Sequence, residues 1–170
     1  MLKYMSLMKK FKSSSIASNI NIVSKTTNDL FLSPHFRLSE FLNSPTALKK
    51  CIANFFPQDR FDLFFGRARV ISDILEDVRS LIDHPITITS GYRCLRLNQE
   101  VGGARSSRHL FMCAVDITFP NFEYNYMRVI NLLRSRNCRF LKVDYARKYI
   151  HVDWTEAFLD RMSESLPFTL

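Results

Sequence analysis

Residues 149–154 read Tyr149-Ile150-His151-Val152-Asp153-Trp154, and their strict alternation predicts the structure of the last part of the chain. Successive side chains of a β-strand point to opposite faces, so the segment is predicted to be a strand with one apolar and one polar face. The apolar face belongs in the core. The polar face carries His151 and must point to a cleft or to water, which leaves this histidine available for chemistry.

Three other segments have the composition of strands. Residues 140–145 precede the alternating strand, and the link of residues 146–148 is short enough for an antiparallel hairpin. Residues 86–89 are β-branched throughout, and residues 113–119 are almost entirely apolar. These segments therefore predict a small sheet.

Helical patterns lie between these strands. The strongest covers residues 61–83, where apolar side chains recur at spacings of 7, 4, 3 and 4 and Pro85 follows the end. Weaker patterns predict a helix over residues 122–136 and a helical turn over residues 95–100. Ser44-Pro45 predicts the cap and first turn of a helix that continues to Ala53.

The order of these elements predicts an α+β fold, with a small, mainly antiparallel sheet and helices packed on one side of it. A chain of 170 residues fits one such domain, which we assign to residues 31–170. Residues 1–30 are rich in Ser, Asn and Lys and lack a clear period. We expect them to form a flexible N-terminal arm.

The composition limits the partners of the chain. Its net charge of +8 favours an anionic partner or surface. No helix-turn-helix, zinc-finger or RNA-binding motif is present, so we expect no nucleic-acid partner. No apolar run approaches the length of a membrane span, and we favour a monomer.

Two histidines and an aspartate are candidate metal ligands. Asp116 shares a strand face with the small Ala114 and Thr118, and a carboxylate in so apolar a strand is costly unless it is paired or metal-bound. His109 follows a Gly-Gly loop. Either residue alone is compatible with an ordinary surface position. Together with His151 they supply the ligands of a hydrolytic zinc ion that keeps one position open for water, here on the face of the sheet.

These residues belong to an ordered set of motifs. The set is the compact amphipathic segment Phe36 to Leu42, Ser90-Gly91-Tyr92-Arg93, Asn98, Val101-Gly102-Gly103, Ser107-x-His109, Ala114-x-Asp116 and His151-Val152-Asp153. It resembles the zinc D-Ala-D-Ala carboxypeptidase and peptidoglycan endopeptidase family, including small phage and bacterial members with a lysostaphin-type fold. The resemblance covers roughly residues 33–154, and its most specific parts are the step from His109 to Asp116 and the terminal His-Val-Asp.

The resemblance implies a zinc metallopeptidase that hydrolyses an amide bond in peptidoglycan stem peptides or cross-links. It implies that His109, Asp116 and His151 bind Zn²⁺ and that Arg93 faces the substrate. There a guanidinium can bind a carbonyl or carboxylate and stabilise an oxyanion. Ser107 is expected either to orient His109 or to contact the substrate.

The chain departs from the family pattern at three positions, Met112, Lys148 and Tyr149. Met112 replaces a usual glycine, which predicts a differently shaped loop. Lys148 and Tyr149 replace an acid and a histidine near the last ligand, so the general base is Asp153, Asp144 or neither. Asp153 can instead orient a metal-binding side chain without binding the metal itself. Tyr149 can bind the oxyanion or simply pack.

Two alternative functions follow from the sequence. The missing acid allows a catalytically impaired cell-wall-binding or virion-associated protein of the same fold. The spacing of His151 and Asp153 also occurs in two-histidine, one-carboxylate iron oxygenases, but these need a later histidine and none follows.

The start of the chain bears on its location. Its apolar residues are interrupted too often to form the core of a signal peptide. We expect synthesis in the cytoplasm without a signal peptide, and action at the cell wall only after delivery by lysis or by a virus particle.

Overall fold

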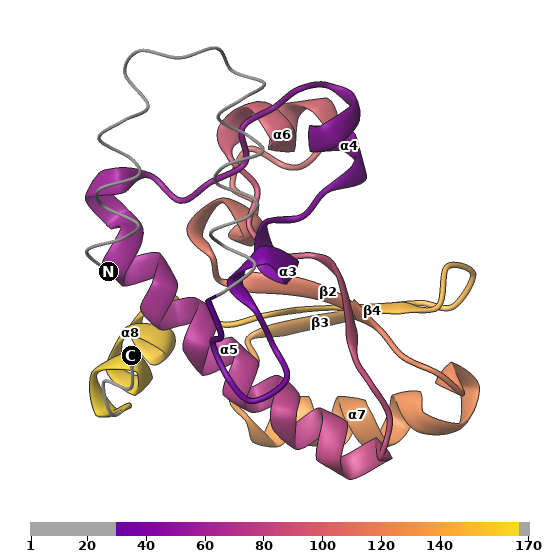
Figure 1. Ribbon diagram of the computed structural model, residues 1–170. Helices are drawn as coiled ribbons and strands as arrows, with labels where there is room; N and C mark the ends of the chain where they lie inside the picture. The colour runs from indigo at the N-terminus through magenta and orange to yellow at the C-terminus, as the bar shows by residue number, and fades with distance from the viewer. Residues whose placement is uncertain (1–29, 167–170) are drawn as a thin grey trace.

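A four-stranded antiparallel sheet, in the order β1-β2-β4-β3, organises the described part of the chain (Figure 1). The computed structural model describes residues 30–166, so the predicted arm lies, apart from Leu30, outside the described residues. The fold is α+β, as predicted. Its strands are β1 (Thr87–Ser90), β2 (Ala114–Thr118), β3 (Phe140–Asp144) and β4 (Tyr149–Asp153).

Helices cover the apolar face of this sheet. The longest, α5 (Phe61–Ile82), matches the predicted range to within one residue, and α7 (Phe122–Ser135) also occupies its predicted place. Their apolar stripes form one core with the inward side chains of β2 and β4, because both surfaces must be removed from water. The strand residues in this core are Val115, Ile117, Ile150 and Val152.

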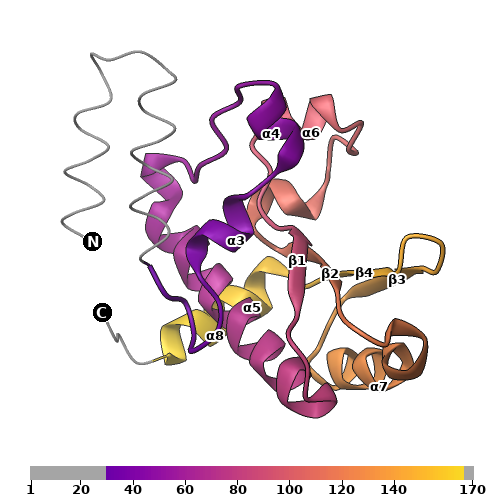
Figure 2. The same cartoon turned by 45° about the vertical axis from the view of Figure 1, so that its right-hand side comes forward.

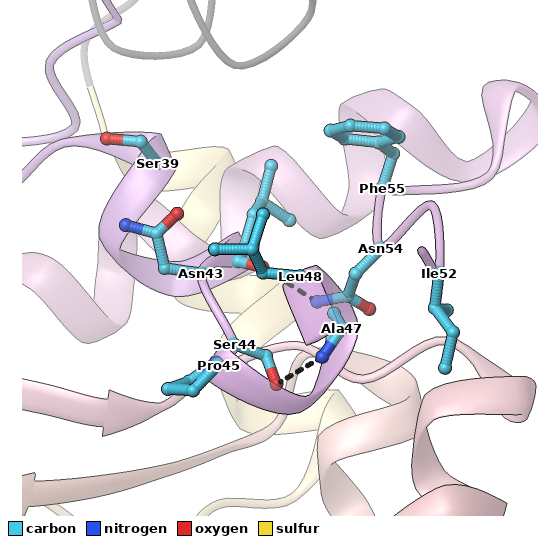
Figure 3. Close-up of a pocket in the computed structure, with 10 residues that line it drawn as sticks. Ser39, Asn43, Ser44, Pro45, Ala47, Leu48, Ile52, Asn54 and Phe55 are labelled. Carbon is cyan, nitrogen blue, oxygen red and sulfur yellow. Dashed lines mark hydrogen bonds between the residues drawn. The ribbon is translucent and has the colours of Figure 1, made fainter. Parts of the chain in front are cut away.

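The predicted helix after Ser44 is shorter than expected. It is α4 (Pro45–Lys49), and the Ser44 hydroxyl accepts the first free backbone N–H at 3.2 Å (Figure 3). The helix stops well before Ala53, because Cys51 takes a left-handed conformation with φ 50°. The prediction of its end was wrong, and no glycine marks the stop.

Two helices lack a predicted counterpart. Helix α8 (Glu156–Ser165) follows β4 and packs along α5. Its cap is Thr155, whose hydroxyl accepts a backbone N–H at 3.2 Å, a signal that the sequence contains. The amphipathic segment of residues 36–42 contains α3 (Leu38–Leu42).

A small layer stands beyond one end of the sheet. In it α4 and α6 (Leu95–Glu100) lie side by side (Figures 1 and 2) around a separate apolar cluster of Ala47, Ile52 and Leu97. The buried Asn54 connects this layer to the loop after β1. Its amide donates to the carbonyls of Leu42 and Tyr92 at 2.8 and 2.9 Å.

Within residues 30–166, no helix combines the length and apolar character that crossing a membrane requires.

The loop that follows β1 lies directly on the end of α3. The backbone N–H of Tyr92 donates to the carbonyl of Phe41 at 2.8 Å. A Cβ atom at Gly91 would lie 2.7 Å from the Cα of Phe41, closer than such atoms can approach. Glycine is therefore required here by contact with another backbone.

We expect Gly91→Ala to lower the free energy of unfolding by roughly 2–3 kcal/mol, because backbone must move to admit the methyl group. The matched control is Gly102→Ala. Gly102 has φ 68° and nothing within 4 Å of its added Cβ, so that change costs only the left-handed strain, about 1 kcal/mol. Urea unfolding measures both, and equal losses would contradict the contact with Phe41.

Candidate metal centre

Three side chains from separate elements converge on the exposed face of the sheet. Asp116 in β2 and His151 in β4 are direct partners across the two strands, which places their side chains next to each other. His109 comes from the short helix η2 (Arg108–Phe111), which leads into β2. One potential ligand atom from each residue lies within 4.8 Å of the other two. The structure thus brings together all three predicted metal ligands.

Two of the three separations between these atoms match those around a bound zinc ion. His109 Nε2 lies 3.4 Å from both His151 Nδ1 and Asp116 Oδ1. Zinc bonds of roughly 2.0–2.2 Å at tetrahedral angles place two ligand atoms about 3.3–3.5 Å apart. The third pair, His151 Nδ1 and Asp116 Oδ1, is a hydrogen bond of 2.7 Å. The donor set and its spacing can hold a divalent ion with further coordination positions open.

The carboxylate of Asp116 is held in its charged form. Burial alone would raise its pKa, but the contacts of the carboxylate with His109 and His151 outweigh burial and keep the pKa well below its usual range. Arg93 donates to the other carboxylate oxygen at 3.0 Å. An ionised oxygen therefore faces the two imidazoles, as metal binding requires.

The orientation of His109 is fixed by the loop after β1. Its Nδ1 lies 2.6 Å from the carbonyl oxygen of Gly91, and a carbonyl can only accept. Nδ1 therefore carries the proton, and the lone pair of Nε2 faces the cluster. Ser107, which was expected to orient His109 or to contact substrate, lines the cleft above the cluster, whereas Nδ1 of His109 donates its hydrogen bond to the carbonyl of Gly91.

Asp153 does not lie on an open polar surface. Its side chain is 2 % exposed, and its two oxygens accept hydrogen bonds from Arg139 at 2.8 Å each. Asp153 still lines the cleft over the cluster, as expected for the polar face of β4, but both of its oxygens are taken by Arg139. Asp153 Oδ2 lies 3.6 Å from Nε2 of His151, on the side of the ring away from Asp116.

Of the other predicted site residues, Arg93 and Tyr149 lie at the cluster, whereas Asp144 lies away from it. Arg93 joins the cluster, with its Nε donating to Ser90 at 2.9 Å. Tyr149 lines a cleft of about 530 Å³ over the cluster. Asp144 pairs with Tyr149 at the hairpin end of the sheet and accepts the backbone N–H of Arg147 at 2.9 Å. It lies outside the lining of this cleft.

The departures at Met112 and Lys148 have visible consequences. Met112 takes φ 51°, a left-handed conformation that glycine adopts without cost, and its side chain is fully buried. The strain of about 1–2 kcal/mol is offset by burial of the side chain, about 1.5–3 kcal/mol. Lys148 lies in the turn of the hairpin and pairs with Glu123 at 2.6 Å, so its ammonium is used away from the cluster.

The buried Arg67, which supports η2 through a hydrogen bond to its last residue, was not predicted from the sequence. Arg67 in α5 is 2 % exposed and donates to Asp160 at 2.7 and 2.9 Å and to the carbonyl of Phe111 at 2.8 Å. The signal was present, since Arg67 lies three residues after Phe64 and four before Ile71, within the apolar stripe. A charge in that stripe indicates a buried partner.

The part of the chain that carries these residues matches a known family. The model of the family described as Peptidase M15 matches residues 34–153, which is more than half of the chain and includes the three candidate ligands. No curated protein and no solved structure matches the chain. On the match to this family model, the chain belongs to the Peptidase M15 family.

Proposed function

We propose that this protein is a zinc-dependent peptidase that hydrolyses an amide bond in peptidoglycan stem peptides or cross-links. The observation that carries the proposal is the convergence of His109, Asp116 and His151 in a cleft that also contains Arg93. Zinc bound by these three residues would supply a water of lowered pKa and polarise a carbonyl. The family supports a peptidase, and the ligand set supports the metal.

Arg93 is suited to bind the substrate oxygen. Its guanidinium has five N–H donors, of which Ser90 and Asp116 take one each. The remaining donors are free for a carbonyl that gains negative charge during hydrolysis. Tyr149 lines the same cleft and can add its hydroxyl as a donor.

Asp153 acts in this proposal as a positioning residue rather than as the general base. Both of its oxygens are bound to Arg139, and its side chain is closed to solvent. A carboxylate behind a ligating imidazole holds the ring and raises its basicity. Asp144 lies at the hairpin end of β3, outside the lining of the cleft over the cluster. We therefore assign the role of general base to neither Asp144 nor Asp153.

A second candidate function is wall binding without catalysis. Among the described residues that line the cleft, the carboxylates are Asp116 and Asp153, and both are engaged in ion pairs. A protein with this fold, a bound metal and no base could hold peptidoglycan without cutting it. In either case the protein would act at the wall after lysis or from a virus particle.

The metal assignment predicts about one zinc ion per purified chain. His109→Ala and His151→Ala should each remove it, because each leaves only two of the three ligands. His84→Ala is the control, since His84 contacts Asn121 and is not part of the cluster. Elemental analysis after dialysis measures the content. Unchanged zinc in both ligand variants would exclude the site.

Hydrolysis predicts the release of new amino groups from purified peptidoglycan. With zinc saturating, Arg93→Ala and Arg93→Lys should lower kcat/KM about 10²–10³-fold, because the oxyanion loses its fixed donors. Arg96→Ala, an exposed arginine in α6, should leave kcat/KM unchanged. Retention of the protein on the wall without release of amino groups would favour the binding function instead.

The role of Asp153 predicts an effect on metal affinity. Asp153→Asn should weaken zinc binding about 10–100-fold, measured by competition with a chelator, because His151 loses its support. Arg136→Gln is the control, since Arg136 pairs with Asp77 at the surface. Unchanged zinc affinity together with abolished hydrolysis would make Asp153 the base and overturn this assignment.

A further inference from the structure

Two clefts meet at the metal-ligand cluster. The first, which we call the β3 cleft, has a volume of about 530 Å³ and is bounded by His109, His151 and the β3 side chains Phe140 and Lys142. The second, the α4 cleft, has about 390 Å³ and runs between the start of α4 and the turn of the hairpin, where it is lined by Arg147. A bound molecule can therefore extend from the cluster in two directions.

The two clefts share one wall. Arg93, Asp116 and Tyr149 line both of them. Arg93 is the proposed oxyanion donor, Asp116 is a candidate metal ligand, and Tyr149 is an aromatic side chain beside them. A peptide whose scissile bond is held at this wall would have one part in the β3 cleft and the other part in the α4 cleft.

The size of the clefts bears on which bond is cut. An enzyme that removes one terminal residue needs room for a single small residue beyond the bond. Here each cleft falls in the range of about 300–1,000 Å³ that holds a ligand of drug size. Phe140 is 49 % exposed and adds an apolar surface for further contacts on the β3 side. This space favours several residues on both sides of the bond.

Each cleft also offers a cation that is not used internally. Among the cations of the β3 cleft, Arg93, Arg108 and Arg139 are paired with carboxylates. Lys142, directly opposite His151 in the sheet, and the guanidinium of Arg147 have no carboxylate partner within residues 30–166. The hairpin that holds Arg147 extends past the rest of the sheet (Figure 2), where a ligand can reach it.

We propose that the site cuts an internal bond of an acidic peptide that passes through both clefts. Lys142 binds a carboxylate of the peptide in the β3 cleft, and Arg147 binds one in the α4 cleft. Water adds across the amide, so the C–N bond breaks and one new carboxyl end and one new amino end form. This substrate class rests on the proposed peptidase function and specifies it as an endopeptidase.

The test compares two substrates of the full-length protein with zinc. One is a cross-linked dimeric muropeptide, which offers internal bonds, and the other is a stem pentapeptide ending in D-Ala-D-Ala. Mass spectrometry separates the products. We expect kcat/KM at least tenfold higher for the dimer, with no free D-alanine as the main product. Release of D-alanine from the pentapeptide at an equal or higher kcat/KM would overturn the inference and leave the peptidase function standing.

Two variants test the clefts separately. Lys142→Ala and Arg147→Ala should each lower kcat/KM for the dimer by roughly two- to fivefold, the value of one solvated ion pair. Each loss should disappear with a substrate shortened on one side of the bond, and the side should differ between the variants. Lys142→Arg should restore activity, and Arg134→Ala on α7 is the control. Losses that persist with both shortened substrates would contradict the assignment.

Binding measurements separate failure of this inference from failure of the proposed function. If neither substrate is cut, the peptidase function fails, and calorimetry of the same dimer still tests the clefts. Tighter binding of the dimer than of the pentapeptide, reduced by Lys142→Ala and by Arg147→Ala, supports the two-cleft peptide site. Equal affinity for both peptides, or affinity unaffected by either variant, overturns it.

Discussion

The cross-strand pairing of Asp116 with His151 is the constraint on which the site depends. Antiparallel pairing puts these side chains on the same face, and the opposite face of both strands is wholly apolar and buried. A slip of one residue would turn the aspartate and the histidine into the core and the apolar side chains into water. Core formation and ligand placement are therefore one requirement. Only His109 must be supplied separately, by η2, and the carbonyl of Gly91 fixes the orientation of its ring.

Ion pairs with one buried and one partly exposed member provide the second level of support. Arg139 and Asp153 form one behind the ring of His151, and Arg67 and Asp160 form another beneath η2. Buried charges carry a desolvation cost, so removal of one partner leaves the other uncompensated. Such pairs tolerate little displacement. They fix the positions of the imidazoles from behind, while the face toward the cleft stays open.

Periodic patterns allowed most of the elements to be predicted. The alternation in β4 and the apolar stripe of α5 are long, local signals, and both elements lie within one residue of their predicted ends. The three candidate metal ligands, which the structure brings together, were also predicted, because they belong to an ordered set of motifs. The end of α4 was predicted wrongly because Cys51 takes a left-handed conformation that no glycine marks in the sequence. The burial of Asp153 could not be predicted because it depends on an ion pair with Arg139, fourteen residues earlier, which leaves no pattern in the local sequence.

The anchoring of η2 by Arg67 has a consequence for biosynthesis. The family match ends at residue 153, whereas Asp160, which holds the guanidinium of Arg67, lies beyond it in α8. His151 is also among the later residues of the described chain. A nascent polypeptide emerging from the ribosome therefore lacks both the last candidate ligand and the support for the first one until α8 has been translated. The three candidate metal ligands can reach the arrangement described above only after that point.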